Sequence, residues 1–302
     1  LADALEGYEG LVSPAVSQGP DAFETGQKLT FLYKKETVEL IKTKVLLEGV
    51  QPEDLVGYPA PPDRFWASGR LPFLMEVKAN INGVQQYVNL VNVHTRSNGG
   101  GESAANPRYA MRRYDVNVLK DSLDQYYGNV PLILLGDFND DLDETVADQF
   151  AATVNTSETS FINYINDPEN YVPVSLTLSN AGLRSFPTFE NVIDHIIVSD
   201  EMRENWLVNS ERIVAPFDLV NNYSSTTSDH IPVKARFSLR CDIIPAQIIG
   251  DSELCFGQNT LNLILVGGEY AEVLGWEVSE DAGQSWNRIP ETEGMTSISL
   301  EN

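Results

Sequence analysis

The chain has 302 residues, of which 44 are acidic and 20 are basic, and its formal net charge is −24. This length allows one large domain with a hydrophobic core and a further, smaller unit. The negative charge repels polyanions at long range and argues against a tight, nonspecific nucleic-acid clamp, although transient cleavage of a bound strand stays open. No apolar run approaches the length needed to span a bilayer, so we expect no membrane span.

The start of the chain and its cysteines bear on where the protein works. Residue 1 is Leu rather than Met, and no signal peptide is visible, so we expect the natural start to lie upstream, which leaves targeting open. The two cysteines, Cys241 and Cys255, could form one disulfide, and free buried thiols fit nearly as well.

Strand-like and helical segments alternate from about residue 28 to residue 240. A helix is expected over residues 107–127, where Met111, Tyr114, Val118 and Leu119 form an apolar face and the charged residues take the other face. Strands are expected around it, at residues 28–33, 74–77, 86–93, 131–135, 192–198 and 231–237. Turn residues at 79–83 predict that the second and third strands form a hairpin. The pattern predicts an α/β domain over residues 1–240 whose loops carry function.

The composition changes near residue 241. From there to the end, 11 acidic residues accompany a single basic one, Arg288, and helical patterns disappear. Residues 260–266 are typical of a strand, and residues 275–279 and 285–289 flank a turn at 280–284, which predicts a hairpin. This segment resembles the immunoglobulin-like modules of secreted bacterial enzymes, so we expect a partial all-β module over residues 241–302.

The candidate chemistry begins with Asp137 and Asn139, which follow a buried strand and Gly136. Residues two apart in an extended segment point the same way, so the two side chains are expected to project together from the strand end. A carboxylate and an amide side by side suit a hard cation with a phosphate or an attacking water. The alternative is an ordinary turn after a strand, which the same residue types favour.

The three histidines, His94, His195 and His230, each lie in or at the end of a predicted strand. Asp194 lies inside an apolar strand, where a buried carboxylate is costly unless it is paired, and His230 is a suitable partner that would fix its own tautomer. His195 faces away from Asp194 on the same strand and is expected to be a supporting residue.

Four motifs occur in the order and rough spacing of the endonuclease/exonuclease/phosphatase superfamily. They are Asn-Val-His at 92–94, Gly-Asp-Phe-Asn at 136–139, Ile-Asp-His at 193–195 and Ser-Asp-His at 228–230. Residues 2–240 resemble this superfamily, which includes deoxyribonuclease I, abasic-site endonucleases, sphingomyelinases and inositol polyphosphate 5-phosphatases. His94 makes the chain look more like deoxyribonuclease I and extracellular bacterial nucleases. The resemblance implies a four-layer α/β/β/α sandwich of two mostly antiparallel sheets.

The resemblance also implies a role for each motif residue. It predicts Mg²⁺ or Mn²⁺, with Ca²⁺ as a further option, and the metal ligands are expected to be Asp229, Asp137 and Asn139. The expected catalytic residues are His94, Asp137, Asn139, Asp194 and His230. Asp137 with Asn139 would position or deprotonate the water, and His230, oriented by Asp194, would stabilise the phosphoryl charge or act as base. Arg70, in Gly69-Arg70-Leu71-Pro72, and Asn92 are expected to contact the substrate phosphate, although Arg70 could equally be an ordinary surface arginine.

One part of the family pattern has no counterpart here. Family members begin with one strand that carries Asn and another that carries a metal-binding Glu, and the sequence offers no candidate for either. Residues 1–8 resemble the helix that follows the Glu strand. We therefore expect a catalytic domain that lacks its first strands and binds metal weakly.

The predicted function is metal-dependent phosphodiester hydrolysis by an extracellular, secreted or cell-surface bacterial DNA or RNA nuclease. Its expected partners are nucleic acid or another phosphodiester, and no stable protein partner is inferred. A phosphatase or a sphingomyelinase-like phospholipase is the alternative within the same chemistry. A non-catalytic binding module with a decayed site is the alternative of a different class.

Overall fold

The computed structural model describes residues 4–99, 103, 106–151, 153–239, 247–250, 260–266, 273–279 and 285–301. The chain divides into two compact units, Leu1–Arg240 and Cys241–Asn302. Both cysteines, and with them the possible disulfide, lie outside the described residues.

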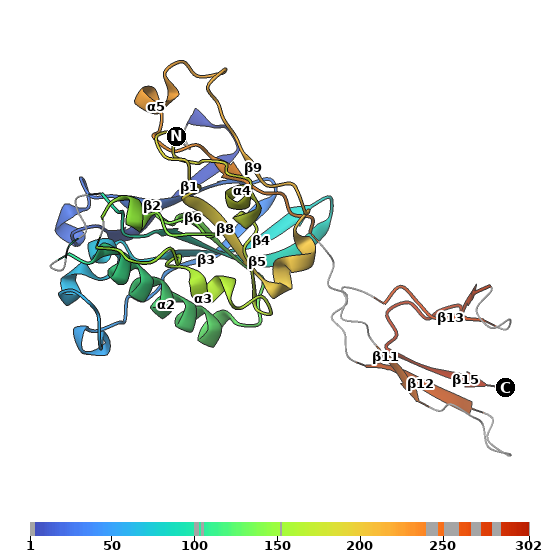
Figure 1. Cartoon of the computed structure of the whole chain (residues 1–302). Helices are drawn as coiled ribbons and strands as arrows, with labels where there is room; N and C mark the ends of the chain where they lie inside the picture. Colours follow the sequence, from blue (N-terminus) through green and yellow to red (C-terminus); the bar gives the residue numbers. More distant parts are fainter. Residues whose placement is uncertain are drawn as a thin grey trace. The chain divides into compact units, whose positions relative to one another are not determined.

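A six-stranded sheet forms the centre of the larger unit (Figure 1). In spatial order its strands are β3 (Val38–Val45), β4 (Phe73–Ile81), β5 (Val84–His94), β6 (Leu132–Asp137), β8 (Asp194–Ser199) and β7 (Tyr171–Val172). Neighbouring strands are antiparallel except for β5 and β6, which are parallel. A parallel pair needs a crossover, and the long helix α2 (Arg108–Tyr127) supplies it.

The predicted hairpin is β4 and β5. The strands pair through Ile81 and Val84, so only Asn82 and Gly83 form the turn, with φ of 53° and 86°. Two residues with positive φ are the requirement of the tight hairpin turn whose twist matches the strands, and Asn-Gly is its preferred sequence.

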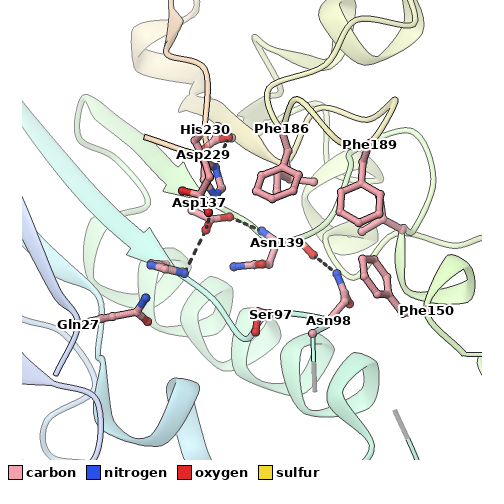
Figure 2. Close-up of a pocket in the computed structure, with 15 residues that line it drawn as sticks. Gln27, Ser97, Asn98, Asp137, Asn139, Phe150, Phe186, Phe189, Asp229 and His230 are labelled. Atoms are coloured by element: carbon pink, nitrogen blue, oxygen red, sulfur yellow. Dashed lines mark hydrogen bonds and ion pairs between the residues drawn. The ribbon is translucent and has the colours of Figure 1, made fainter. Parts of the chain in front are cut away.

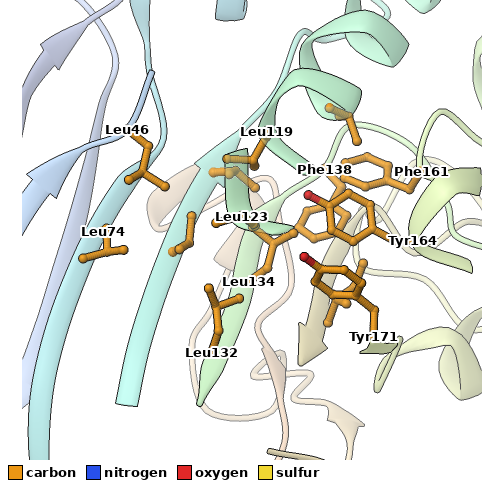
Figure 3. Close-up of a cluster of buried hydrophobic side chains, with 14 of the residues drawn as sticks. Leu46, Leu74, Leu119, Leu123, Leu132, Leu134, Phe138, Phe161, Tyr164 and Tyr171 are labelled. Atoms are coloured by element: carbon orange, nitrogen blue, oxygen red, sulfur yellow. The ribbon is translucent and has the colours of Figure 1, made fainter. Parts of the chain in front are cut away.

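Both faces of the sheet are buried, and α2 covers one of them (Figure 3). Leu74 of β4 faces α2 and packs with Leu119 and Leu123, whereas Phe73 and Met75 point to the opposite face, as the strand alternation requires. Phe138, which follows β6, stacks on Phe161 on the α2 side with ring centroids 4.3 Å apart. These contacts hold the end of β6 in place.

The opposite face of the sheet packs against β2 (Lys28–Lys34) through Leu29, Phe31 and Tyr33. A second strand, β1 (Tyr8–Val16), pairs with β2, and a separate short ladder joins β9 (Arg212–Ile213) to β10 (Val233–Lys234). The layer that was expected as a second sheet is therefore described as two two-stranded ladders. The mostly antiparallel α/β fold predicted from the sequence is confirmed, and Figure 1 shows α2 and β1–β2 on opposite sides of the sheet.

Three local expectations need correction. The strand expected at residues 231–237 is only two residues long, because β10 pairs only with the equally short β9. The described part of the stretch expected as a helix, residues 4–7, is a turn that leads into β1. The helix over residues 107–127 does form, but its charges are not confined to a solvated face, because Arg112, Asp115 and Lys120 are buried.

The remaining helices of this unit are short. The α-helical turns are α3 (Ile162–Ile165), α4 (Leu176–Asn180) and α5 (Tyr223–Thr226), whereas α1 (Phe65–Gly69) is a turn in which Trp66, Ala67 and Ser68 have positive φ. The 3-10 turns are η2 (Pro20–Ala22), η3 (Pro52–Asp54), η4 (Pro62–Arg64), η5 (Ala147–Gln149) and η6 (Asp200–Asn205). Across the described ranges, no helix combines the length and the apolar character that crossing a membrane requires.

The described residues of the smaller unit form strands and no helix. β11 (Gln247–Gly250), β12 (Thr260–Val266) and β15 (Ser297–Glu301) make one antiparallel sheet. β13 (Glu277–Val278) and β14 (Asn287–Arg288) pair as the predicted hairpin requires, and their turn at 280–284 lies outside the described residues. An immunoglobulin-like identity for this unit stays a prediction.

Candidate active site

Three adjacent strands of the central sheet bring polar side chains to one edge. His94 is the last residue of β5 and lies opposite Asp137, the last residue of β6. Asp137 in turn lies opposite Asp194, the first residue of β8. Residues opposite one another on paired strands have their side chains on the same face, so the register alone gathers these three groups.

Gly136 allows the strand ends to approach this closely. Its φ is 133°, and a Cβ atom there would lie 2.0 Å from the carbonyl oxygen of Val93 and 2.8 Å from the side chain of Asn92. Any other residue would push β6 away from β5, because such distances fall below van der Waals contact. The glycine of the Gly-Asp-Phe-Asn motif is thus a packing requirement of the site.

The fourth group, His230, comes from the loop before β10. Its Nδ1 lies 2.8 Å from Oδ2 of Asp194, which is the pairing that the sequence favoured. Its Nε2 points toward Asp137, 3.8 Å from Oδ2 of that residue, and Nε2 of His94 lies 3.0 Å from the same oxygen. Asp137 therefore sits between two imidazoles, and one of these is held by a second carboxylate.

The protonation of these groups follows from burial and charge. Burial and the negative charge of Asp194 raise the pKa of Asp137 to about 7. Burial and the nearby positive charge of Arg70 lower the pKa of His94 to about 3, so this imidazole is neutral at neutral pH. Burial works against protonation of His230 as well, but the hydrogen bond and charge of Asp194 outweigh it and raise the pKa of His230 to about 9.

The backbone conformation of Asn139 differs from the extended one expected from the sequence. The extended segment ends before it, because its φ is 50°, and its backbone N–H donates to Oδ1 of Asp137 at 2.9 Å. Its side-chain amide donates to the carbonyl of Thr95 at 3.2 Å, and the side chain of Asn98 donates to the backbone carbonyl of Asn139 at 2.7 Å. Asn139 thereby ties the loop after β6 to the loop after β5.

These groups line a cavity of about 510 Å³, shown in Figure 2. Its polar half includes all six residues expected to be catalytic or to bind metal, namely His94, Asp137, Asn139, Asp194, Asp229 and His230. The rest of its lining is Gln27, Ser97, Asn98 and Gly99 on further polar segments and Val146, Phe150, Phe186, Phe189 and Ile193 in an apolar half.

A buried ion pair supports the loops that carry this lining. Arg112 and Asp140 are both fully buried, and Nη2 of Arg112 lies 3.1 Å from Oδ2 of Asp140. Arg112 also donates to the carbonyl of Arg96 at 3.0 Å and to Oδ1 of Asn98 at 2.7 Å, both on the loop after β5. The pair therefore links α2 to the loops after β5 and β6.

His195, by contrast, lies in the core. It is 1% exposed, with Nδ1 2.8 Å from the hydroxyl of Ser175 and Nε2 2.8 Å from the carbonyl of Val192. Burial lowers its pKa to about 3, so the ring is neutral. The supporting role expected from its orientation agrees with these contacts.

Neither of the two residues expected to contact the substrate phosphate lines the cavity. Arg70 is 3% exposed and donates to the carbonyls of His94 at 3.0 Å and Thr95 at 3.1 Å, and its remaining nitrogen bonds to Gln27. Asn92 donates to the carbonyl of Thr30 on β2 at 2.9 Å. In this structure both side chains brace the end of β5, and a phosphate contact would require these hydrogen bonds to break.

The potential metal ligands also differ in part from those expected. Within the described residues, Asp137, Asp194 and His230 form a group whose ligand atoms all lie within 4.8 Å of one another. Asp229, an expected ligand, is exposed at the cavity wall, and the expected ligand Asn139 turns its amide toward Thr95. Two carboxylates in one partly buried site repel each other, and a hard divalent cation with oxygen ligands would relieve that repulsion.

The apolar half of the cavity was not predicted from the sequence. Phe150 comes from the loop after β6, and Phe186, Phe189 and Ile193 come from the segment before β8. The only signal was a pair of phenylalanines three residues apart in a segment rich in turn residues, and such a pair is more often a core contact.

Fold and site together are those of a phosphoester hydrolase. The model of the Endonuclease/Exonuclease/phosphatase family matches residues 5–230, and the chain belongs to this family. Members of the family hydrolyse phosphodiesters or phosphate monoesters and typically depend on a divalent metal. No curated protein matches the chain significantly.

Several solved structures are similar to this one at low sequence identity. The catalytic domain of human Nocturnin, solved with a bound sulfate anion, is 15% identical with a TM-score of 0.48 and is matched over 78% of this chain and 73% of its own. A 3'-5' exonuclease from Neisseria meningitidis is 18% identical, with a TM-score of 0.46, over 78% of this chain and 83% of its own. A mannosyl-6-phosphatase from Bacteroides thetaiotaomicron is also 18% identical, with a TM-score of 0.46, over 78% of both chains.

Proposed function

We propose that this protein is a metal-dependent phosphodiester hydrolase and that its natural substrate is nucleic acid, acted on outside the cell. The observation that carries the proposal is the Asp194–His230–Asp137–His94 chain of contacts at one end of the cavity. A purely structural cluster would be buried and satisfied internally, whereas all four of these side chains border an open cavity.

The chain's own residues supply orientation and proton transfer. Asp194 holds Nδ1 of His230, so Nε2 is left to face the cavity as a hydrogen-bond donor when the ring is protonated. That donor is suited to the charge that develops on a phosphoryl oxygen. Asp137 borders the cavity between the two imidazoles and is suited to orient a water and accept its proton. His94 remains neutral and fixes the position of Asp137.

A divalent metal fits this half of the cavity. Asp137 and Asp194 would hold it, with Asp229 as the additional anionic ligand at the wall. When bound, the cation would neutralise phosphate charge and lower the pKa of a bound water. Oxygen donors favour Mg²⁺, Mn²⁺ or Ca²⁺ over softer metals.

The decisive assay measures hydrolysis of bis-p-nitrophenyl phosphate by the full-length gene product with Mg²⁺ or Mn²⁺, before and after EDTA. We expect metal-dependent release of p-nitrophenolate that Asp137→Asn abolishes. Asp143→Asn is the matched control, because Asp143 is an exposed carboxylate that does not line the cavity. Activity that survives in Asp137→Asn would contradict the role proposed for Asp137, and no activity with any metal would contradict the hydrolase proposal and favour a binding module.

The same assay separates the alternatives within phosphoester chemistry. A phosphatase would prefer the monoester p-nitrophenyl phosphate over the diester, and a phospholipase would cleave sphingomyelin in preference to DNA. Faster cleavage of DNA or RNA than of either would support the nuclease.

A further inference from the structure

The apolar half of the cavity has no role in the chemistry described above. Phe186 and Phe189 are stacked, with ring centroids 5.3 Å apart and planes 24° apart. Phe150 adjoins them, with its centroid 5.1 Å from that of Phe189 and its plane tilted by 52°. Figure 2 shows the three rings gathered together, apart from Asp137 and Asp229. Three partly exposed aromatic rings in a polar site leave apolar surface in water, which is unfavourable unless a ligand covers it.

This aromatic wall is fixed to the polar half by hydrogen bonds. The hydroxyl of Ser185, next to Phe186, accepts from the backbone N–H groups of Ile193 at 2.9 Å and Asp194 at 3.1 Å. The carbonyl of Ser185 accepts from the N–H of Ile231 at 2.6 Å, so it also holds the residue after His230. The Phe186 ring stands edge-on to the imidazole of His230, with centroids 5.1 Å apart.

A second set of contacts holds the loop that carries Phe150. Gln149 donates to the side chain of Asn191 at 3.0 Å, which joins the loop after β6 to the segment before β8. Asp141 accepts from the N–H of Val192 at 2.9 Å and makes the same connection a second time. The distance from the rings to the acidic residues is therefore set by the fold.

From this arrangement we propose that Phe150, Phe186 and Phe189 form a subsite that stacks against the nucleobase carried by the phosphate under attack. The inference rests on the proposed hydrolase function and narrows its substrate. Aromatic rings prefer offset or tilted contact with other flat rings, which a nucleobase provides. Val146 and Ile193 are the further apolar side chains in the described lining of this half.

Stacking in this subsite requires a base that is free of its neighbours in a strand. Taking a base out of a duplex costs a few kcal/mol, so an unpaired or terminal nucleotide enters far more readily. The net charge of −24 also disfavours extended binding of a polyanion. The substrate class is therefore single-stranded nucleic acid, its ends, or small nucleotide esters.

The test compares two esters with one leaving group, methyl p-nitrophenyl phosphate and thymidine 5′-(p-nitrophenyl phosphate). Base stacking on aromatic side chains predicts that kcat/KM is about 5- to 150-fold higher for the thymidine ester. Phe189→Ala and Phe150→Ala should each reduce that ratio, and Phe189→Leu, which keeps apolar volume without a ring, should reduce it too. Tyr87→Ala, at a 54% exposed aromatic residue on β5 outside the cavity, is the control and should leave the ratio unchanged.

Equal kcat/KM for the two esters, or a ratio that survives in both alanine variants, would overturn the subsite. A preference for p-nitrophenyl phosphorylcholine over the thymidine ester would assign the wall to a lipid headgroup instead. Calorimetry that compares the affinity for thymidine 5′-monophosphate with the affinity for methyl phosphate tests the subsite separately from the hydrolase function. If no ester is cleaved, the hydrolase proposal fails, and the subsite stands only if wild type binds the nucleotide more tightly than Phe189→Ala does.

Discussion

The two halves of the cavity are built in different ways. The polar half comes from the ends of β5, β6 and β8, where strand register alone places His94, Asp137 and Asp194 side by side. The aromatic half comes from two loops, residues 146–150 and 186–193, that are held to each other and to the sheet by side-chain hydrogen bonds. The sheet therefore positions the residues proposed for catalysis, and the loops are proposed to determine which group on the phosphate can bind.

Among the variants that compare the two halves, His230→Ala should have the largest effect on kcat, and that effect should not depend on the substrate. We expect His230→Ala to lower kcat by about 10²- to 10⁴-fold, the usual contribution of a positioned acid or base. The loss should be similar for the methyl and the thymidine ester, because His230 is proposed to act at the reacting phosphate and not at the base. The measurement is steady-state kinetics on both esters, and a loss confined to the thymidine ester would place His230 in the aromatic half.

The second prediction concerns Arg112, which supports both halves at once. Arg112→Met should lower the free energy of unfolding by about 3–5 kcal/mol, because Asp140 would keep its charge in the core without the partner. Arg113→Met is the matched control, since Arg113 is the next residue and pairs with the half-exposed Glu158. A surface pair of this kind contributes about 0–1 kcal/mol.

Urea unfolding followed by circular dichroism measures the free energy of unfolding of the Arg112 and Arg113 variants. We also expect Arg112→Met to impair hydrolysis of both esters, since Arg112 holds the carbonyl of Arg96 and the side chain of Asn98. Equal stability of the two variants would mean that the buried pair is not the link between the halves.

The contrast between the halves also explains what the sequence could and could not predict. Asp137 and Asp194 stand in short motifs at the ends of paired apolar strands, so their meeting follows from local pattern and strand pairing. His230 lies in a loop, and its pairing with Asp194 was expected because a carboxylate in an apolar strand needs a partner. Arg112 lies in a helix among other charges, and its burial depends on Asp140, 28 positions along the chain. Long-range pairing of that kind leaves no periodic signal.

The aromatic wall could not be predicted from the sequence for a similar reason. Phe150 and Phe189 meet only because the loop after β6 and the segment before β8 fold against each other, and loops carry no hydrophobic period. For Arg70 the motif predicted a contact with the substrate phosphate. In the structure its guanidinium donates to backbone carbonyls instead.

A third prediction sharpens the role given to the aromatic half. A single-stranded oligonucleotide should be cleaved about 10- to 100-fold faster than the same sequence in a duplex, because the duplex must first release a base at a cost of a few kcal/mol. Phe189→Ala should lower the ratio of single-strand to duplex cleavage. His230→Ala should lower both cleavage rates and leave their ratio near its wild-type value. Gel analysis of end-labelled strands gives both rates, and a preference for duplex would contradict the stacking model.

The smallest effect is expected from Asp115, which lies on α2 outside both halves of the cavity. Burial raises the pKa of this fully buried carboxyl well above its usual range, against the opposing positive charge of Arg96. The unfolded chain therefore loses this proton first as the pH rises, from about 3.9 upward, and the free energy of unfolding falls until the pH reaches the folded-state pKa. Asp115→Asn is neutral at every pH and removes that contribution.

The stability of Asp115→Asn relative to wild type should consequently rise by about 1 kcal/mol between pH 4 and pH 5. Urea unfolding at the two pH values measures it, and Asp121→Asn, at an exposed position on the same helix, should show no such rise. Because Asp115 does not line the cavity, the ratio of thymidine to methyl ester hydrolysis should stay at its wild-type value. A change in that ratio would show that α2 influences the aromatic half through more than Arg112.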